Sequence, residues 1–303
     1  MEYFYKRTKK RLFFVSGVLF YFLFFISCDK FEGDQQVPAF IKIDSISVRT
    51  DFNTQGTASH NIKDAWIYVD GDLIGPFELP CIAPVLAEGK HRITIRPGIE
   101  VNGISTLHSP YPFYERLEYE NFTLRSDSIL DFKDTLKTTY TEETIFAWME
   151  DFQAGISIVD ASKSDTTIVQ ISNPDMVFHD PGVLHTNRSG MIALTSEKNL
   201  YEGSGPEGIA IPTDNSVVMM EINFKTENVI TTGLWVDTYS NIFQEAVLNL
   251  NTTTKWKKIY VNLTPAVQRN TDAYSFKAFI GSLLSDGNDD AIILIDNIKL
   301  LYR

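Results

Sequence analysis

Apolar and polar residues alternate at every second position over much of this chain, and this pattern constrains the fold more than any other feature. The alternation runs through residues 40–48, 90–96, 216–225, 229–239 and 291–301. A period of two is that of a β-strand with one buried face, whereas an amphipathic helix repeats every 3.6 residues. The segments between these runs are rich in Asn, Asp, Gly, Ser and Pro, which favour turns. We therefore expect an all-β protein built from sandwich domains.

A two-residue turn is predicted at Asp70-Gly71, between the β-rich runs 64–69 and 73–75. Type I′ hairpin turns need positive φ at both central residues, and Asp-Gly supplies this at low cost. The sequence therefore predicts that these two runs pair as an antiparallel hairpin.

The first 28 residues combine three features in order. Five basic side chains lie within residues 6–11, an apolar run covers residues 12–26, and Ser27 precedes Cys28. This order is that of a secretory signal, and Cys28 after a small residue resembles the signal of bacterial lipoproteins. The resemblance implies a signal peptide over residues 1–27 and a diacyl or triacyl anchor of the palmitate type on Cys28. The alternative is a retained signal-anchor helix, but an apolar run of 15 residues falls short of the roughly 20 that span a bilayer.

Residues 28–37 are polar and acidic, and they contain too few apolar side chains to pack. We interpret them as a tether. Acidic residues directly after a lipidated Cys resemble the surface-export signal of lipoproteins from the Bacteroidetes, although Lys30 and Phe31 interrupt the acids here. The resemblance implies a lipid-anchored protein of the outer membrane. Exposure at the cell surface and attachment facing the periplasm both remain open.

The charge balance excludes one large class of partners. Without residues 1–27, the 27 basic and 39 acidic side chains of the chain become 22 and 38, and the formal net charge falls from −12 to −16. Nucleic acids and anionic headgroups bind to positive surfaces, so neither is expected as a partner of the folded part. Apart from Cys28 there is only Cys81. No intramolecular disulfide is then possible, and we expect Cys81 to be a small buried hydrophobe.

The predicted domain 38–143 contains a segment that resembles PEGA-type surface modules. The matching residues are Val69-Asp70-Gly71, Ile74-Gly75, Pro84, Glu88-Gly89-Lys90 and Ile93-Thr94-Ile95. Such modules are small β-sandwiches of envelope proteins, so the resemblance implies a scaffold and not a reaction. The polar stretch 138–144 lacks apolar periodicity and marks the boundary to a second β series.

The predicted domain 144–303 resembles the jelly roll of carbohydrate-binding modules in three segments, 150–155, 255–263 and 295–300. These segments begin, divide and end the domain in the order that the family has. The resemblance implies a galactose-binding-like jelly roll and a structural Ca²⁺ site. The matching acidic positions are Glu150, Asp151 and Asp296. Gln153 replaces an acid that usually binds the ion in that family.

An aromatic strand face is the main candidate for binding. Opposite the core positions of residues 229–239 lie Trp235, Asp237 and Tyr239. We expect the neighbouring strand to add Glu221 and Asn223, and the Gly-rich loop after Leu200 to add Tyr201. Aromatic rings beside carboxylates and amides suit sugars, and an exposed aromatic pair also suits a protein interface. The third interpretation is that Trp235 covers the edge of the core.

No catalytic constellation is found, so we expect no enzyme. Neither a zinc helix of the H-E-x-x-H type nor a G-x-S-x-G elbow occurs. His179 and His185 share a loop, and the simplest interpretation of both is surface exposure. Four triplets of Asp, Ser or Thr, and an apolar residue resemble the O-glycosylation signal of the Bacteroidetes. They place candidate acceptor hydroxyls at Ser45, Ser128, Thr135 and Thr166.

Together these features predict a non-enzymatic, lipid-anchored envelope protein with two β-sandwich domains. The leading interpretation is an accessory subunit of an outer-membrane protein complex. The alternative is a surface lipoprotein that binds glycans through a domain of the carbohydrate-binding-module type.

Overall fold

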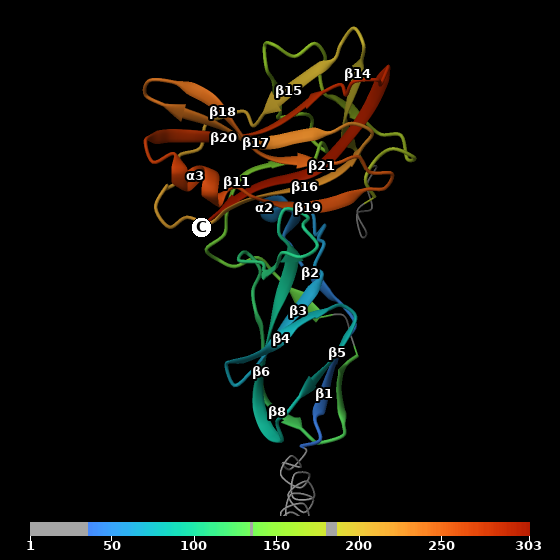
Figure 1. Ribbon diagram of the computed structural model, residues 1–303, viewed down its shortest axis with the longest axis vertical. Helices are drawn as coiled ribbons and strands as arrows, with labels where there is room; N and C mark the ends of the chain where they lie inside the picture. The colour runs from blue at the N-terminus through green and yellow to red at the C-terminus, as the bar shows by residue number, and fades with distance from the viewer. Residues whose placement is uncertain (1–35, 134–135, 180–186) are drawn as a thin grey trace, which may run out of the picture.

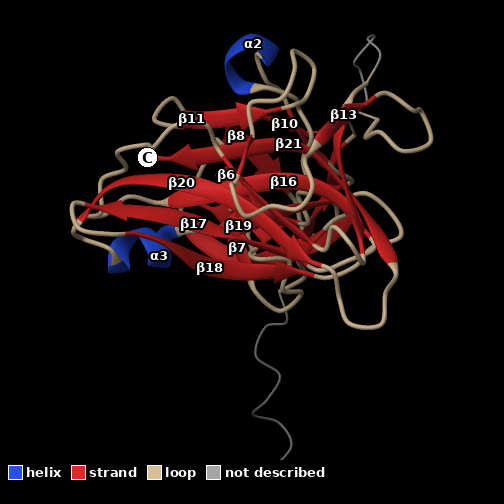
Figure 2. Cartoon of the chain, turned by 90° about the horizontal axis from the view of Figure 1, so that it is seen from above, coloured by secondary structure: helices blue, strands red, loops and turns tan. Residues whose placement is uncertain are grey.

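The computed structural model describes residues 36–303 except 134–135 and 180–186. Strands make up nearly all of its regular structure, and the prediction of an all-β fold is confirmed. Two short helices accompany them, α2 (Phe52–Gln55) and α3 (Thr264–Arg269), which lie on opposite sides of the molecule seen from above (Figure 2). Within the described residues no helix is long and apolar enough to cross a membrane. The predicted signal peptide and Cys28 lie outside the described residues.

The N-terminal strands form a narrow stem below a wider C-terminal sandwich (Figure 1). The first sheet of the stem has the order β5-β1-β9, a two-stranded sheet pairs β10 with β2, and the third has the order β4-β3-β6-β7 with β8 also on β6. The bounds are β1 (Ala39–Ile43), β2 (Ile46–Val48), β3 (Asp64–Val69), β4 (Asp72–Glu78), β5 (Cys81–Val85), β6 (Gly89–Glu100), β7 (His108–Pro110), β8 (Leu117–Leu124), β9 (Ile129–Phe132) and β10 (Leu136–Thr138).

The predicted Asp70-Gly71 hairpin is present and joins β3 to β4 as antiparallel neighbours. Asp70 has φ of 51° and Gly71 has φ of 97°, as a type I′ turn requires. Inward side chains such as Ile41, Ile67 and Ile95 are fully buried between the sheets of the stem. Each contributes about 1.5–3 kcal/mol by leaving water. Cys81 is only half-buried and packs at the margin of this core, and its burial raises the pKa of the thiol.

The C-terminal sandwich is a jelly roll of two facing sheets. The six-stranded sheet has the order β13-β14-β21-β16-β19 with β11 also on β21, and the five-stranded sheet has the order β12-β15-β20-β17-β18. The bounds are β11 (Ile145–Glu150), β12 (Val159–Asp160), β13 (Val169–Ile171), β14 (Ser189–Thr195), β15 (Leu200–Ser204), β16 (Val218–Thr226), β17 (Ile230–Thr238), β18 (Ile242–Leu250), β19 (Lys257–Asn262), β20 (Ala273–Leu283) and β21 (Asp290–Tyr302).

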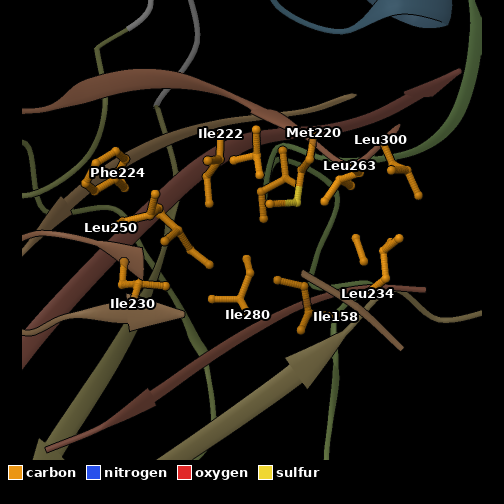
Figure 3. Packing of buried hydrophobic residues seen from close by; sticks show 14 of the residues in the cluster. Ile158, Met220, Ile222, Phe224, Ile230, Leu234, Leu250, Leu263, Ile280 and Leu300 are labelled. Carbon is orange, nitrogen blue, oxygen red and sulfur yellow. The ribbon is translucent and has the colours of Figure 1, made fainter. Parts of the chain in front are cut away.

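The core of the sandwich lies between the two sheets (Figure 3). Ile222 and Phe224 enter it from β16, and Ile230 and Leu234 enter it from β17. The strands predicted from alternation are therefore present, and their alternate apolar residues point inward. The consecutive strands β16 and β17 belong to opposite sheets, so their non-core residues face away from each other.

The stem packs against the outer face of the six-stranded sheet. A cluster of buried side chains fills this junction, and Val101 of the stem forms a parallel bridge with Tyr260 on β19. The buried members are Val48, Ile99, Tyr111, Phe113, Tyr114, Tyr140, Met219, Tyr260 and Leu301. One outer face of the sandwich is thus covered by the same chain, and the outer face of the five-stranded sheet is left for other contacts.

Candidate functional site

The candidate site is the outer face of the five-stranded sheet, here called the concave face. On β17 the side chains of Leu234 and Val236 are buried in the core, so Trp235 and Asp237 between them point outward and are half-buried. Trp235 lies opposite Gln244 on β18 and Lys277 on β20. The face is therefore built from side chains of at least three adjacent strands around one indole ring.

A hydrogen bond across the sheet shows that this face is concave. The Gln244 side-chain amide on β18 donates to the Glu202 carboxylate on β15 at 2.6 Å. Two strands, β20 and β17, lie between them, and a flat sheet would hold β15 and β18 about 14 Å apart. The contact therefore requires a strongly curved and twisted sheet. Lys163 also forms an ion pair with Glu202 at 2.8 Å, so this carboxylate is neutralised.

Phe279 forms the floor of the concave face. It projects from β20 on the same side as Lys277, away from the main core, yet only 4% of it is exposed. Its ring approaches that of Trp235 edge-on, with centroids 6.4 Å apart. Gly233 makes room for it, because a Cβ there would lie 2.8 Å from the Phe279 ring and would also collide with a backbone carbonyl of β18. Position 233 therefore requires glycine, because the Phe279 ring and the β18 backbone lie too close to its Cα for a Cβ to fit.

An exposed tyrosine pair lies at one end of this face. The rings of Tyr239 and Tyr274 are 5.1 Å apart and tilted by 31°. Tyr239 is 92% exposed, although an unsupported aromatic ring would gain by burial. The Tyr274 hydroxyl donates to Asp237 at 2.7 Å, which fixes the orientation of one ring. This hydrogen bond raises the pKa of Tyr274, since the neutral hydroxyl is the donor.

The concave face offers two kinds of contact at once. Aromatic rings present apolar surface, while Gln244 and Lys277 supply donors and Asp237 supplies acceptors. This combination suits recognition of a ligand with both apolar and hydroxyl-bearing surfaces.

The structure brings some of the predicted contact residues together and separates others from them. Trp235, Asp237 and Tyr239 do lie together on an accessible surface. Glu221 and Asn223 are on β16 in the opposite sheet and are buried, so their predicted place beside Trp235 is wrong. The prediction for Tyr201 is also wrong.

Tyr201 is fully buried in the core of the sandwich. It lies on β15 at an inward position, while its neighbour Glu202 points outward to the concave face. The Gly-rich surroundings suggested a surface loop, but the segment is a strand that pairs with β20.

Five residues of the concave face were not predicted as contacts: Glu202, Gln244, Tyr274, Lys277 and Phe279. Tyr274 and Lys277 lie in a run that alternates, so their strand could be predicted. Its position beside β17 could not, because about 35 residues separate the two strands in sequence. Strand order decides this, and periodicity does not encode strand order.

Glu221 instead forms the polar centre of the junction between stem and sandwich. Its carboxylate accepts hydrogen bonds from the hydroxyls of Tyr111 at 2.8 Å and Tyr140 at 2.9 Å, and pairs with Lys258 at 2.7 Å. Burial by itself would raise the pKa of Glu221, but the charges of Lys258 and Lys299 and these hydrogen bonds hold it below its ordinary value. The carboxylate is therefore ionised and fully paired.

The three predicted calcium ligands do not converge on one point. Glu150 accepts a hydrogen bond from the Ser157 hydroxyl at 2.6 Å, and Asp296 accepts one from the Ser189 hydroxyl at 2.6 Å. Asp151 accepts from a backbone N–H two residues further on, at 3.0 Å. Among the described residues, no group of three or more His, Cys, Asp or Glu side chains could hold a metal ion. These residues do not fit a calcium cage in this arrangement, and calcium binding stays a prediction.

The remaining predicted positions are distributed over the surface. His179 is exposed and contacts a backbone carbonyl at 2.7 Å, while its partner in the predicted loop, His185, lies outside the described residues. Ser45, Ser128 and Thr166 are half-buried, and Thr135 lies outside the described residues. O-glycosylation at these hydroxyls stays a prediction.

Comparisons with known proteins find structural likeness alone. No family model matches the chain, and no curated protein matches it significantly. The xylan-binding domain CBM22-2 from Paenibacillus barcinonensis shares 14% identity with a TM-score of 0.34, over 51% of this chain and 98% of that one. A carbohydrate-binding module of the β-sandwich superfamily shares 14% identity with a TM-score of 0.35, over 88% of this chain and 99% of that one.

A third similar structure is the family 11 carbohydrate-binding module from Clostridium thermocellum, in complex with a β-1,3-1,4-mixed-linked tetrasaccharide. It shares 12% identity with a TM-score of 0.33, over 50% of this chain and 94% of that one. TM-scores this low carry no argument about function.

Proposed function

We propose that this protein binds carbohydrate without catalysis, through the concave face of its five-stranded sheet. The observation that carries the proposal is the exposed aromatic surface of Trp235, Tyr239 and Tyr274 with Asp237 between them. Sugars have apolar CH faces that stack on aromatic rings and hydroxyls that pair with carboxylates and amides. The face has both kinds of group on a rigid sheet, which lowers the entropy lost on binding.

The alternative use of such a face is a protein interface, and two features favour a sugar. The aromatic surface is divided by polar groups, Asp237, Gln244 and Lys277, whose remaining hydrogen-bonding capacity would be left unmet against a dry apolar surface. The curvature made by the contact between Glu202 and Gln244 also favours an elongated ligand over a flat partner.

Glycan-array binding followed by calorimetry tests this proposal. We expect Trp235→Ala to weaken glycan binding by about 2 kcal/mol, or roughly 30-fold, as for a central aromatic contact. The control is Phe52→Ala, which removes an exposed aromatic ring from α2, far along the chain from the concave face. If no glycan binds the wild type, or if both variants bind equally well, the proposal is wrong.

We also propose that the protein carries a lipid anchor on Cys28 and serves as an accessory subunit of an outer-membrane protein complex. Both statements rest on the sequence pattern before Cys28, which lies outside the described residues. Cys28→Ser should release the protein from membranes, and extraction in a gentle detergent should copurify a defined barrel protein. Recovery of the lipoprotein alone would contradict the subunit role and leave glycan binding intact.

A further inference from the structure

A second hollow lies where the stem meets the side of the sandwich. It has a volume of about 600 Å³. The stem lines it with residues 59–61, 63, 100, 102 and 103, and the sandwich lines it with Phe178 and with residues 223–224, 249–253 and 256–259. The end of β18 reaches it through Asn249 and Leu250, but Trp235, Asp237, Tyr239, Tyr274 and the other residues named above for the concave face do not line it. Its volume is within the range of about 300–1,000 Å³ that small-molecule sites have. This hollow, the junction pocket, is therefore a separate candidate site built by both parts of the chain.

Five asparagines line the junction pocket, and three of them, Asn61, Asn102 and Asn223, are each held by a hydrogen bond at one end of the amide. Asn61 donates to the Lys258 carbonyl at 3.1 Å, and the Asn102 carbonyl accepts from the Asn262 N–H at 2.7 Å. The Asn223 carbonyl accepts from a hydroxyl of the stem at 2.9 Å. An amide has two donors and two acceptor positions. Within the described chain, the side-chain carbonyl of Asn61 and the side-chain amino groups of Asn102 and Asn223 can therefore form further hydrogen bonds with a ligand.

An aromatic wall closes one side of the junction pocket. The rings of Phe178 and Trp256 meet at 73° with centroids 5.5 Å apart, and both are half-buried. This edge-to-face pair fixes the orientation of the Trp256 indole. A fixed ring next to oriented amides is the same combination of apolar and hydrogen-bonding surface that hydroxyl-bearing rings require.

The junction pocket carries only a small excess of positive charge. Lys258 is paired with the buried Glu221, and the rim carries Lys63 and Lys257 together with Glu100. The pocket also contains His60, and its burial, followed by the charge of Lys258, lowers the pKa of this imidazole and keeps it neutral at pH 7. A multiply charged ligand would find no matching set of charges.

We propose that the junction pocket binds a neutral, hydroxyl-rich ligand of one or two sugar units, with Asn61, Asn102 and Asn223 as hydrogen-bonding groups and Trp256 as the stacking surface. Because both parts of the chain line the pocket, such a ligand contacts stem and sandwich together. The proposal does not depend on binding at the concave face.

The four tryptophans of the chain allow a test that separates the two sites. Trp256 reports on the junction pocket, Trp235 reports on the concave face, and Trp66 and Trp148 serve as internal references. The full chain, labelled with ¹⁵N, is titrated with glucose, galactose, mannose, xylose and their β-1,4-linked disaccharides, while the indole N–H resonances are followed. Trp256→Phe and Trp235→Phe assign the two resonances.

We expect at least one probe to shift the Trp256 resonance while the two reference resonances stay in place. Thr252→Trp, which fills the pocket from an exposed loop position, should weaken that shift at least tenfold without lowering the melting temperature. Asn102→Ala should weaken it as well. The proposal is overturned if no probe shifts Trp256 at millimolar concentration, or if Thr252→Trp leaves the shift unchanged. A shift confined to Trp235 would support the concave face and refute the junction pocket.

Discussion

The two outer faces of the sandwich carry similar residues, but one face is buried and the other is exposed. The face of the six-stranded sheet presents Glu221, Lys258 and Tyr260, all buried under the stem. The face of the five-stranded sheet presents Trp235 and Tyr274, which solvent reaches. Tyrosines, lysines and acids at outward positions therefore do not identify a binding surface by themselves. What distinguishes the two faces is whether another segment of the chain covers them.

Removing the charge at the centre of the covered face should have the largest effect. Glu221→Gln leaves Lys258 buried without its anion, and we expect a loss of about 3–5 kcal/mol in the free energy of unfolding. Denaturant titration measures it. The control, Glu142→Gln at an exposed position, should change stability by less than about 0.5 kcal/mol. Equal effects of the two variants would mean that the covered face does not depend on its ion pair.

The tyrosines of the covered face should also make it sensitive to alkali. Burial, reinforced by the charge of Glu221, raises the pKa of Tyr111 and Tyr140 well above the ordinary value near 10. A raised folded-state pKa means that their contribution is complete below about pH 10 and is lost as the pH rises further.

We therefore expect the free energy of unfolding to fall above about pH 10, with tyrosinate absorbance from these residues appearing only as the protein unfolds. Tyr111→Phe removes one hydrogen bond to the Glu221 carboxylate and should cost about 1.5–3 kcal/mol at neutral pH. Tyrosinate that forms fully without unfolding would show that these hydroxyls reach solvent.

On the open face, Gly233→Ala tests the packing under Trp235. The new Cβ would press on Phe279 and on the β18 backbone, so we expect a loss of about 1–3 kcal/mol together with weaker glycan binding. Gly281→Ala is the matched control on the adjacent strand, because its Cβ would meet only ordinary contacts at 3.4 Å or more. A thermal unfolding series that ranks the two variants equally would refute the close approach.

The smallest effect on stability is expected at the most exposed ring. Tyr239→Ala removes a side chain that is 92% exposed. We therefore expect the free energy of unfolding to change by less than about 0.5 kcal/mol, with a correspondingly small shift in the melting temperature. Glycan affinity should nevertheless fall by about tenfold, which corresponds to about 1.4 kcal/mol. Unchanged affinity in calorimetry would limit the proposed site to the region around Trp235.

Alternation predicted which residues of the sandwich form strands and which of their side chains point inward. Val218–Thr226 and Ile230–Thr238 lie close to the predicted bounds, because a buried face imposes a period of two on any strand. The same pattern does not indicate that these strands lie in different sheets. It therefore predicts Glu221 beside Trp235, which is wrong. Sheet assignment depends on long-range pairing, such as Trp235 with Lys277, which no local signal records.

The covered face also has a mechanical consequence. The hydroxyls of Tyr111 and Tyr140 donate hydrogen bonds to the Glu221 carboxylate of the sandwich. In the other direction, Lys299 of the sandwich donates to the Thr57 carbonyl at 2.7 Å. A pull applied at the lower end of the stem, where β1 begins, would pass through this dry, charge-paired contact before it reached the concave face (Figure 1). Stem and sandwich would then carry load together, with the concave face held at a fixed distance from the start of β1.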